Sequence, residues 1–351
     1  MNYADEKTEN QAVMLANRLK KRWRHLKKWA HRTGAGVFRL YDRDIPEIPL
    51  VLDYFGNCAL PEESALSGAL YKRPYEKSGA EEGQWLLAMK NAASQALNIP
   101  CVNVFLKQRS RQKGASQYEK IDNARFIKVV KESGLSFKVN LSDYLDCGLF
   151  PDKRLLRGLV RKEATGKSVL NLFSYTGSFS IYAAAGGAAS TDSVDLSNTY
   201  LAWARENFLL NGFSAYIMNH GEWEFSQRRM GIPRGPHALI RADALVFLDK
   251  AAASGKEWDL IILDPPVFSN SKKMAGNFDL RRDIVETTRL CLGLLAQGGK
   301  LILSVNAKRH KITARKLEEA LSGAMVADLG DKVTDEDFRG RRTPSSFLLT
   351  L

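Results

Sequence analysis

Cysteine is scarce in this sequence, and its four cysteines are scattered. Cys58, Cys101, Cys147 and Cys291 form no C-x-x-C pair. This spacing argues against a zinc site and against a disulfide framework. We therefore expect no metal and a reducing, cytoplasmic compartment.

Long hydrophobic runs are absent as well. No apolar stretch approaches the roughly 20 residues that cross a bilayer, and the first residues carry no signal-peptide pattern. Both absences predict a protein without a membrane partner. The length of 351 residues and the hydrophobic fraction of 44% are those of an ordinary globular protein with two domains.

Acidic residues are outnumbered by basic ones, with 39 Asp and Glu against 52 Lys and Arg, for a net charge of +13. Excess positive charge favours a polyanionic partner, and nucleic acid is the most frequent one. A generally basic surface without such a partner is the alternative that composition alone leaves open.

One stretch predicts the first half of a nucleotide-binding βαβ unit. The apolar run 168–173 has the length and branching of a buried strand, and 174–178 supplies Gly, Ser and Thr for a turn and a helix cap. A small-residue helix over 179–185 follows, and a second strand ends on Asp195. Asp195 lies about where such folds place the carboxylate that binds ribose hydroxyls.

The turn at 174–178 lacks both G-x-G-x-x-G and Walker spacing. A diphosphate ligand is therefore not expected. A ligand with a ribose but no phosphate fits better, and S-adenosylmethionine is the commonest one. We predict that this turn binds S-adenosylmethionine.

Strands and helices alternate through the C-terminal part of the chain, which is typical of a doubly wound sheet. Beyond Asp195 we expect a helix over 197–211, strands over 239–241, 259–263 and 300–305, a helix over 280–295, and a closing antiparallel pair over 325–329 and 346–351. The predicted fold class is α/β. We expect residues 149–351 to form a Rossmann-like domain with a seven-stranded doubly wound sheet.

Residues 1–148 predict a smaller α+β domain preceded by a basic helix. We expect frayed residues over 1–10, helices over 11–31 and 84–97, and strands over 37–40, 50–54, 58–60, 102–106 and 136–141. The helix carries cations at Lys20, Lys21, Arg22 and Arg24, among others. We interpret them as contacts to an RNA backbone, with a solvated helix face as the alternative.

A second basic segment follows the strand at 102–106. Its cations include Lys107, Arg109, Arg111 and Lys113, and Tyr118 supplies an aromatic ring. A basic loop with an aromatic residue suits a phosphate backbone and stacking on a base. An ordinary hairpin loop is the alternative.

Asp264-Pro265-Pro266-Val267-Phe268 follows the strand at 259–263. This places it at the carboxyl edge of the sheet, where open α/β sheets bind ligands. Taken alone it reads equally as a strand-ending turn, because Pro-Pro interrupts strand pairing. Together with Asp243 one strand earlier, it favours a ligand site.

Several motifs resemble the class I S-adenosylmethionine-dependent RNA methyltransferases. They are NLFSYTGS at 171–178, Asp195, Asn207 with Asn211-Gly212, and DPPVFSNSKK at 264–273. Within that superfamily the chain is most similar to the RlmK type, the C-terminal half of a fused bacterial enzyme. ENQAVMLANRL at 9–19, RLYD at 39–42, QYEK at 117–120 and NLSDYLD at 140–146 extend the likeness over nearly the whole chain.

The resemblance implies methylation of guanine N7 in large-subunit (23S) ribosomal RNA, with a smaller N-terminal domain that positions the RNA. The sequence has no counterpart of the other half of the fused enzyme, so a separate RlmL-like chain is a candidate partner. The irregular segment from His220 to His237 is longer than the family pattern leads us to expect.

The resemblance also assigns site residues. Those implied to bind the cofactor are Phe150, Asp152, Arg154, Ser174, Tyr175, Thr176, Gly177, Asp195, Leu196, Asp243, Ala244 and Asp264, with Tyr118 reaching in from the other domain. Those implied to border the reacting groups are Asp264, Pro265, Pro266 and Phe268. The expected RNA contacts are Lys20, Lys21, Arg22, Arg24, Lys107, Arg109, Arg111, Lys113, Lys272, Lys273 and Lys308.

Cytosine C5 methylation is the alternative within the superfamily, and it requires a covalent cysteine because cytosine C5 is not nucleophilic on its own. Relatives place that cysteine after the strand matching 300–305, where this chain has Asn306 and no cysteine. Guanine N7 already carries a lone pair and no proton, so no general base is needed. The target guanine would be extruded from the RNA, stacked on Phe268 or Tyr175, and read by Asn270, Ser271 or Asn306.

Two readings from other classes stay open. One is an RNA accessory protein that binds the cofactor without catalysing, and the other is a methyltransferase acting on a small molecule or a protein.

Overall fold

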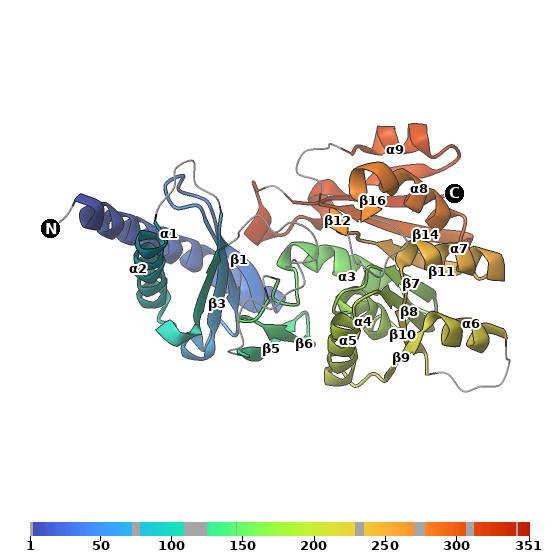
Figure 1. Cartoon of the computed structure of the whole chain (residues 1–351), viewed down its shortest axis with the longest axis horizontal. Helices are drawn as coiled ribbons and strands as arrows, with labels where there is room; N and C mark the ends of the chain where they lie inside the picture. The colour runs from blue at the N-terminus through green and yellow to red at the C-terminus, as the bar shows by residue number, and fades with distance from the viewer. Residues whose placement is uncertain are drawn as a thin grey trace. The chain divides into compact units, whose positions relative to one another are not determined.

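A computed structural model describes residues 3–71, 78–108, 125–144, 146–228, 235–269, 278–306, 312–341 and 343–351. The chain divides into two compact units. Unit 1 comprises Met1–Pro151 and Glu336–Arg339, and unit 2 comprises Asp152–Asp335 and Gly340–Leu351. Figure 1 labels many of their helices and strands. Over the described ranges, no helix is long and apolar enough to cross a membrane.

Unit 1 is an α+β unit in which helices α1 and α2 pack against a mostly antiparallel sheet. Its elements are α1 (Tyr3–Thr33), β1 (Val37–Asp42), β2 (Leu50–Phe55), β3 (Ala65–Leu70), α2 (Gly79–Leu97), β4 (Val104–Gln108), β5 (Ile127–Glu132) and β6 (Leu135–Asn140). The sheet has the order β1-β2-β3-β4, and only β3 and β4 run parallel. β5 and β6 form a separate antiparallel hairpin.

Helix α1 is held by one apolar stripe. Leu15, Leu19 and Leu26 recur at helical spacing and are fully buried. The expectation that residues 1–10 are frayed is wrong, because α1 begins at Tyr3. The strand expected at 58–60 is also wrong: Leu60 N donates to Asn57 O and closes a turn, and the third strand begins at Ala65 instead.

The short turn Glu336–Phe338, which comes late in the chain, belongs to unit 1. Asp337 is fully buried there and accepts a 2.9 Å hydrogen bond from the backbone N–H of Arg39 on β1. Arg22 of α1 donates to the Asp337 carbonyl oxygen, and the guanidinium of Arg39 lies 5.2 Å from the centre of the Phe338 ring. Unit 1 is thus completed by residues that follow nearly all of unit 2 in sequence.

Unit 2 is a doubly wound α/β fold. Its elements are α3 (Arg154–Glu163), β7 (Ser168–Leu172), α4 (Ser178–Ala185), β8 (Ser190–Asp195), α5 (Asn198–Leu210), β9 (Ala215–Asn219), α6 (His220–Arg228), β10 (His237–Arg241), α7 (Ala244–Ser254), β11 (Trp258–Leu263), β12 (Phe268–Ser269), β13 (Phe278–Asp279), α8 (Leu280–Leu292), β14 (Leu295–Val305), α9 (Ala314–Ala320), β15 (Met325–Asp328) and β16 (Ser345–Thr350). Short 3-10 turns cover Pro61–Glu63 and Cys101–Asn103 in unit 1, Pro151–Lys153 at the boundary between the two units, and Gly330–Val333 in unit 2.

The central sheet has the order β15-β16-β14-β11-β7-β8-β10-β9. The strands from β14 to β9 run parallel, and β16 is antiparallel to both β14 and β15. The doubly wound α/β fold and the closing antiparallel pair are confirmed. The described sheet has eight strands rather than the expected seven, because β9 pairs with the outer edge of β10. Tyr216 and Ile217 of β9 are exposed, so β9 lacks the apolar pattern of a buried strand.

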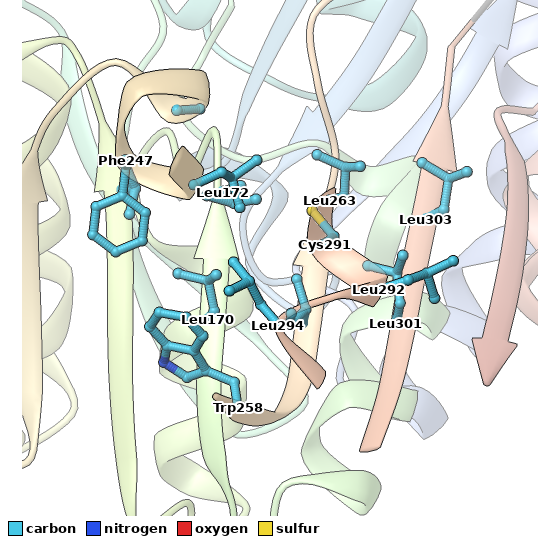
Figure 2. Close-up of a cluster of buried hydrophobic side chains, with 14 of the residues drawn as sticks. Leu170, Leu172, Phe247, Trp258, Leu263, Cys291, Leu292, Leu294, Leu301 and Leu303 are labelled. Carbon is cyan, nitrogen blue, oxygen red and sulfur yellow. The ribbon is translucent and has the colours of Figure 1, made fainter. Parts of the chain in front are cut away.

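Helices cover both faces of this sheet. Leu170 and Leu172 of β7 point into a core shared with α6, α7, α8 and α9, whereas Val169 points into a second core shared with α3 and α4. Figure 2 shows the first core, in which Cys291 of α8 lies among Leu263, Leu292 and other apolar side chains. The alternation along β7 is the two-residue period of a strand buried on both faces.

Two expected boundaries near β14 are wrong. Helix α8 ends at Leu292 rather than 295, and β14 starts at Leu295 rather than 300. Gly298 and Gly299 therefore lie inside the strand instead of closing the helix. Strand pairing shifts register between Trp258 and Leu260 opposite this segment, which is the irregularity that glycine in a strand commonly marks.

Buried His237 on β10 makes the stability of unit 2 depend on pH. Its Nδ1 lies 3.0 Å from Thr191 Oγ1, and its ring packs against Phe208 and Phe213. Burial lowers the pKa of His237 to about 4. Because the unfolded chain then takes up a proton first, stability falls as the pH drops from about 6.5 towards 4.

We expect His237→Gln to remove about 2 kcal/mol of the stability difference between pH 7.5 and pH 5, relative to the wild type. Denaturant unfolding of both proteins at the two pH values measures this difference. His31→Gln, at an exposed position, is the matched control for replacing a histidine by glutamine. An unaltered pH dependence in His237→Gln would contradict the prediction.

Candidate cofactor-binding site

The candidate site lies where the order of strands reverses. From β7 the chain continues to β8 and β10 on one side of the sheet, and later to β11 and β14 on the other. Open α/β sheets bind ligands outside the carboxyl ends of their strands at this switch point. The residues that follow these strands, including Ser174, Asp195, Asp243 and Asp264, therefore share one edge of the sheet.

The turn after β7 has an unusual backbone. Phe173 and Tyr175 both have left-handed conformations, with φ of 55° and 50°, and Gly177 follows with φ of 76°. Such conformations are strained for residues with side chains and persist only where neighbouring contacts hold them. Ser174 N donates to Val194 O at 3.0 Å, and Asn207 Nδ2 donates to Thr176 O at 3.1 Å. The turn is thus fixed before any ligand binds.

Gly177 is required at its position for two reasons. Its positive φ disfavours residues with a Cβ. A Cβ added there would also lie 3.0 Å from the Cβ of Ala204 on α5. The glycine therefore lets the start of α4 approach α5 closely.

Asp195, at the end of β8, connects two turns. Its Oδ2 accepts a 2.9 Å hydrogen bond from Tyr175 N, and its Oδ1 accepts one of 2.9 Å from Ser197 N. Burial raises the pKa of Asp195 to about 6, while these backbone donors oppose the rise. The carboxylate keeps acceptor capacity for a further donor, such as a ribose hydroxyl.

Ser174 has a buried hydroxyl that lacks a hydrogen-bond partner among the described residues. Ser174 is 5% exposed and lies two residues after Leu172, the last residue of β7. A buried polar atom without a partner costs free energy unless a ligand or water satisfies it. Its position at the switch point fits a polar group of a bound cofactor.

Asp243 begins helix α7 as its N-cap. Its Oδ1 accepts from Leu245 N at 2.9 Å and from Val246 N at 3.4 Å. Oδ2 has no partner within the described part of the chain. Ala244, the next residue, is buried at 7% exposure. One carboxylate oxygen is therefore fixed by the helix and the other is open to a donor such as an amino group.

Asp264, after β11, is paired with a buried lysine. Lys153 Nζ lies 2.7 Å from Asp264 Oδ1 and also donates to Ser304 Oγ on β14. The side chains of Lys153 and Asp264 are 7% and 21% exposed. Pro265 is buried, and Phe268 on β12 is 40% exposed.

Other residues expected at the cofactor have different surroundings. Arg154 is 3% exposed and forms a 2.8 Å ion pair with Asp335, so its guanidinium supports a neighbouring segment of unit 2. Phe150 belongs to unit 1 and is 40% exposed. Asp152 lies in the turn Pro151–Lys153, and Leu196 is half-buried.

Tyr175 contributes its backbone to the site and its ring to packing. The ring centroid lies 4.5 Å from that of Tyr200 and 6.4 Å from that of Trp203, both on α5. This ring therefore packs on α5, which leaves Phe268 as the more exposed of the two aromatic residues expected to stack on a base.

The expected RNA contacts divide into three groups. Lys20, Lys21 and Arg24 are exposed on α1. Arg22 is half-buried and donates to Leu40 O and Asp337 O, and Lys107 is 8% exposed with its ammonium bonded to Tyr144 O. Arg109, Arg111, Lys113, Lys272, Lys273 and Lys308, together with Tyr118, Asn270 and Ser271, lie outside the described residues.

Sequence reasoning missed three supporting interactions. The sequence does not predict a role for Lys153, although its ammonium donates a hydrogen bond to Asp264. Asn207 was matched as a motif residue, but its bond to Thr176 O was not foreseen. Asn171 Nδ2 donates to Ser180 Oγ, which lies 2.7 Å from Ser193 Oγ and so joins β7, α4 and β8 by a buried polar chain. In the sequence, the sign of this polar chain is Asn171, which lies inside the otherwise apolar run 168–173.

The side chains at the switch point fit a cofactor that contains a ribose. The Asp195 carboxylate can accept from a ribose hydroxyl, Asp243 Oδ2 can accept from an amino group, and Ser174 Oγ supplies a buried hydroxyl. In the described ranges, no group of three or more His, Cys, Asp or Glu side chains is arranged to hold a metal ion.

Comparison with known proteins agrees with this fit. Residues 69–325 match the family of S-adenosylmethionine-dependent methyltransferases. Ribosomal RNA large subunit methyltransferase K of Neisseria meningitidis is 40% identical over 327 residues, which cover 93% of this chain and 84% of that protein. The K/L protein of Methylococcus capsulatus is 40% identical over 328 residues, and the chain spans 41% of its length.

Solved structures share the fold. The crystal structure of SMU.776 in complex with SAH has a TM-score of 0.72 at 23% identity, covering 97% of this chain and 82% of that one. An S-adenosylmethionine-dependent methyltransferase from Agrobacterium tumefaciens has a TM-score of 0.55 at 20% identity, covering 90% of both chains.

The family match and the shared fold agree on the cofactor, and the acceptor groups at the switch point fit it. The chain belongs to the S-adenosylmethionine-dependent methyltransferase family, among relatives named ribosomal RNA large subunit methyltransferase K and K/L.

Proposed function

We propose that this protein methylates N7 of a guanine in 23S ribosomal RNA by direct in-line transfer from S-adenosylmethionine. The observation that carries the proposal is the 40% identity, over 93% of the chain, to a relative named as a large-subunit rRNA methyltransferase. The basic balance of the chain, with a net charge of +13, supports an RNA substrate.

In this proposal the chain supplies binding and positioning. Asp195 accepts from the ribose hydroxyls, Asp243 accepts from the adenine amino group, and Ser174 bonds a polar group of the methionine part. Bound S-adenosylmethionine supplies an electrophilic methyl group on its sulfonium. Asp264, Pro265 and Phe268 border the target base and hold N7 in line with that methyl group. N7 bears no proton, so no residue has to act as a base.

Cysteine chemistry is not available where cytosine C5 methylation would need it. Cys291 is fully buried in α8 among apolar side chains, and burial raises the pKa of its thiol (Figure 2). Ser304 and Asn306 occupy the end of β14, with Ser304 bonded to Lys153. These surroundings support transfer without a covalent intermediate.

RNA binding is proposed for the exposed face of α1. Lys20, Lys21, Arg24, Lys27 and Lys28 are all exposed there. Arg22 and Lys107 are left out because their cationic groups bond to buried carbonyl oxygens. A row of exposed cations on one helix suits the spacing of phosphates along an RNA backbone.

The direct test is methyl transfer from labelled S-adenosylmethionine to protein-free 23S rRNA, followed by nucleoside analysis. We expect label in 7-methylguanosine, and its loss in Asp195→Ala. Label in 5-methylcytidine would contradict the proposed base. Bound cofactor without any transfer would favour a non-catalytic accessory protein or a requirement for a separate RlmL-like chain.

Cofactor affinity should depend on the ionisation of Asp195. Because its pKa is about 6 and ribose hydroxyls donate to the ionised carboxylate, affinity should fall as the pH drops below 6. We expect binding about tenfold weaker at pH 5 than at pH 7.5, as measured by titration calorimetry. Asp195→Asn should bind weakly at both values, without this trend. A wild-type affinity that is flat over this range would contradict the role of Asp195.

Removing cations from α1 should weaken RNA binding in a salt-dependent way. We expect Lys20→Gln/Arg24→Gln to lower the slope of log affinity against log salt by about 1.4, because each lost phosphate contact contributes about 0.7. The control is Lys316→Gln/Lys332→Gln, which removes the same charge from exposed positions of unit 2. Equal losses in both variants would indicate a general charge effect and contradict a specific α1 surface.

A further inference from the structure

We propose that Lys153 is a positioning residue for the methyl-transfer reaction: it holds one oxygen of the Asp264 carboxylate so that the other faces the target base. The inference rests on the proposed function and adds a residue to it. Lys153 Nζ lies 2.7 Å from Asp264 Oδ1, and Oδ2 has no partner in the described part of the chain.

The three acidic residues that follow β8, β10 and β11 are held in different ways. Asp195 accepts from the backbone N–H of Ser197, and Asp243 accepts from that of Leu245. In both cases the donor is the second residue after the acid, as in an ordinary Asx turn. Backbone donors therefore fix these two carboxylates.

Asp264 cannot receive a hydrogen bond from the backbone of the two residues that follow it. The next two residues are Pro265 and Pro266, and proline has no backbone N–H. Neither of the two following positions can therefore donate to the carboxylate. A side chain has to take the place of the missing backbone donors, and Lys153 is the donor that the structure provides.

Lys153 is itself held in place. Its side chain is 7% exposed and its ammonium also donates to the hydroxyl of Ser304, which is fully buried on β14. β14 is the parallel neighbour of β11, with Leu303 opposite Leu263. The lysine thus reaches from the start of α3 to the ends of two adjacent strands. A buried ammonium is stable only when it is paired and hydrogen-bonded, and both conditions are met here.

Asp264 Oδ2 can accept a hydrogen bond from the target base. An ionised carboxylate is purely an acceptor, so Oδ2 suits an N–H of the base. Guanine presents such donors at N1 and at its exocyclic amino group, on the edge away from N7. Methylation of N7 leaves a positive charge on the ring, which a nearby carboxylate stabilises. Asp264 contributes in both ways only if its carboxylate keeps one orientation, and the hydrogen bond from Lys153 fixes that orientation.

The test compares Lys153→Met with Lys153→Arg, Asp264→Asn and the double variant Lys153→Met/Asp264→Asn. At saturating cofactor we expect Lys153→Met to lower kcat about 10- to 100-fold, while cofactor affinity stays within about twofold. Lys153→Arg should recover much of the rate, because it keeps a cation near Asp264.

The double variant separates positioning from general structural support. If Lys153 acts through Asp264, adding Lys153→Met to Asp264→Asn should lower kcat no further, because the carboxylate that Lys153 holds is already gone. A lysine that only supports the fold would lower kcat in both backgrounds.

Three results would overturn the inference. They are an unchanged kcat in Lys153→Met, a loss confined to cofactor affinity, which would make Lys153 a cofactor ligand, and a further rate loss when Lys153→Met is added to Asp264→Asn.

Failure of the proposed function gives a different pattern, in which wild-type protein transfers no methyl group to rRNA. The ion pair is then tested by unfolding. Lys153→Met should be less stable than the double variant, because it leaves the Asp264 carboxyl without the cation that pairs with it. Equal stability of these two variants would overturn the inference even in an inactive protein.

Discussion

The Asp195 carboxylate joins the turn after β7 to the turn after β8, and the geometry of the cofactor site depends on this link. Its two oxygens accept from Tyr175 N and Ser197 N, so one side chain fixes both turns. Tyr175 has a left-handed backbone that an isolated chain would rarely adopt. The bond to Asp195 helps to hold that conformation, and folding therefore prepares the site before the cofactor arrives.

The parts of the site that sequence reasoning predicted well have local causes. The strand at 168–173, the cap at Ser197 and the alternation of strands and helices follow from periodicity and from caps within a few residues. The double proline after Asp264 likewise marks the end of β11 within the chain itself. Such signals do not depend on distant parts of the chain, so they survive in the folded protein.

The parts that were missed depend on distant partners. Lys153 and Asp264 are 111 residues apart in sequence, and no periodicity links them. Lys107 looked like part of a basic loop, yet its ammonium bonds to Tyr144 O in the interior. Edge strand β9 gains its place by backbone pairing with β10 rather than by burying its side chains. Each of these features depends on a contact that forms only in the folded chain.

The short segment Glu336–Arg339 bears on the order in which the protein is completed during synthesis. Asp337 accepts from Arg39 N, and the two residues are 298 positions apart. The ribosome therefore releases β1 long before Asp337 has been made. Strand β16, which separates β14 from β15 in the sheet, emerges later still. Domain-by-domain folding from the N-terminus, the usual course for a chain with two units, leaves both units unfinished here. The nascent chain must remain unaggregated until Glu336–Arg339 and β16 have been made.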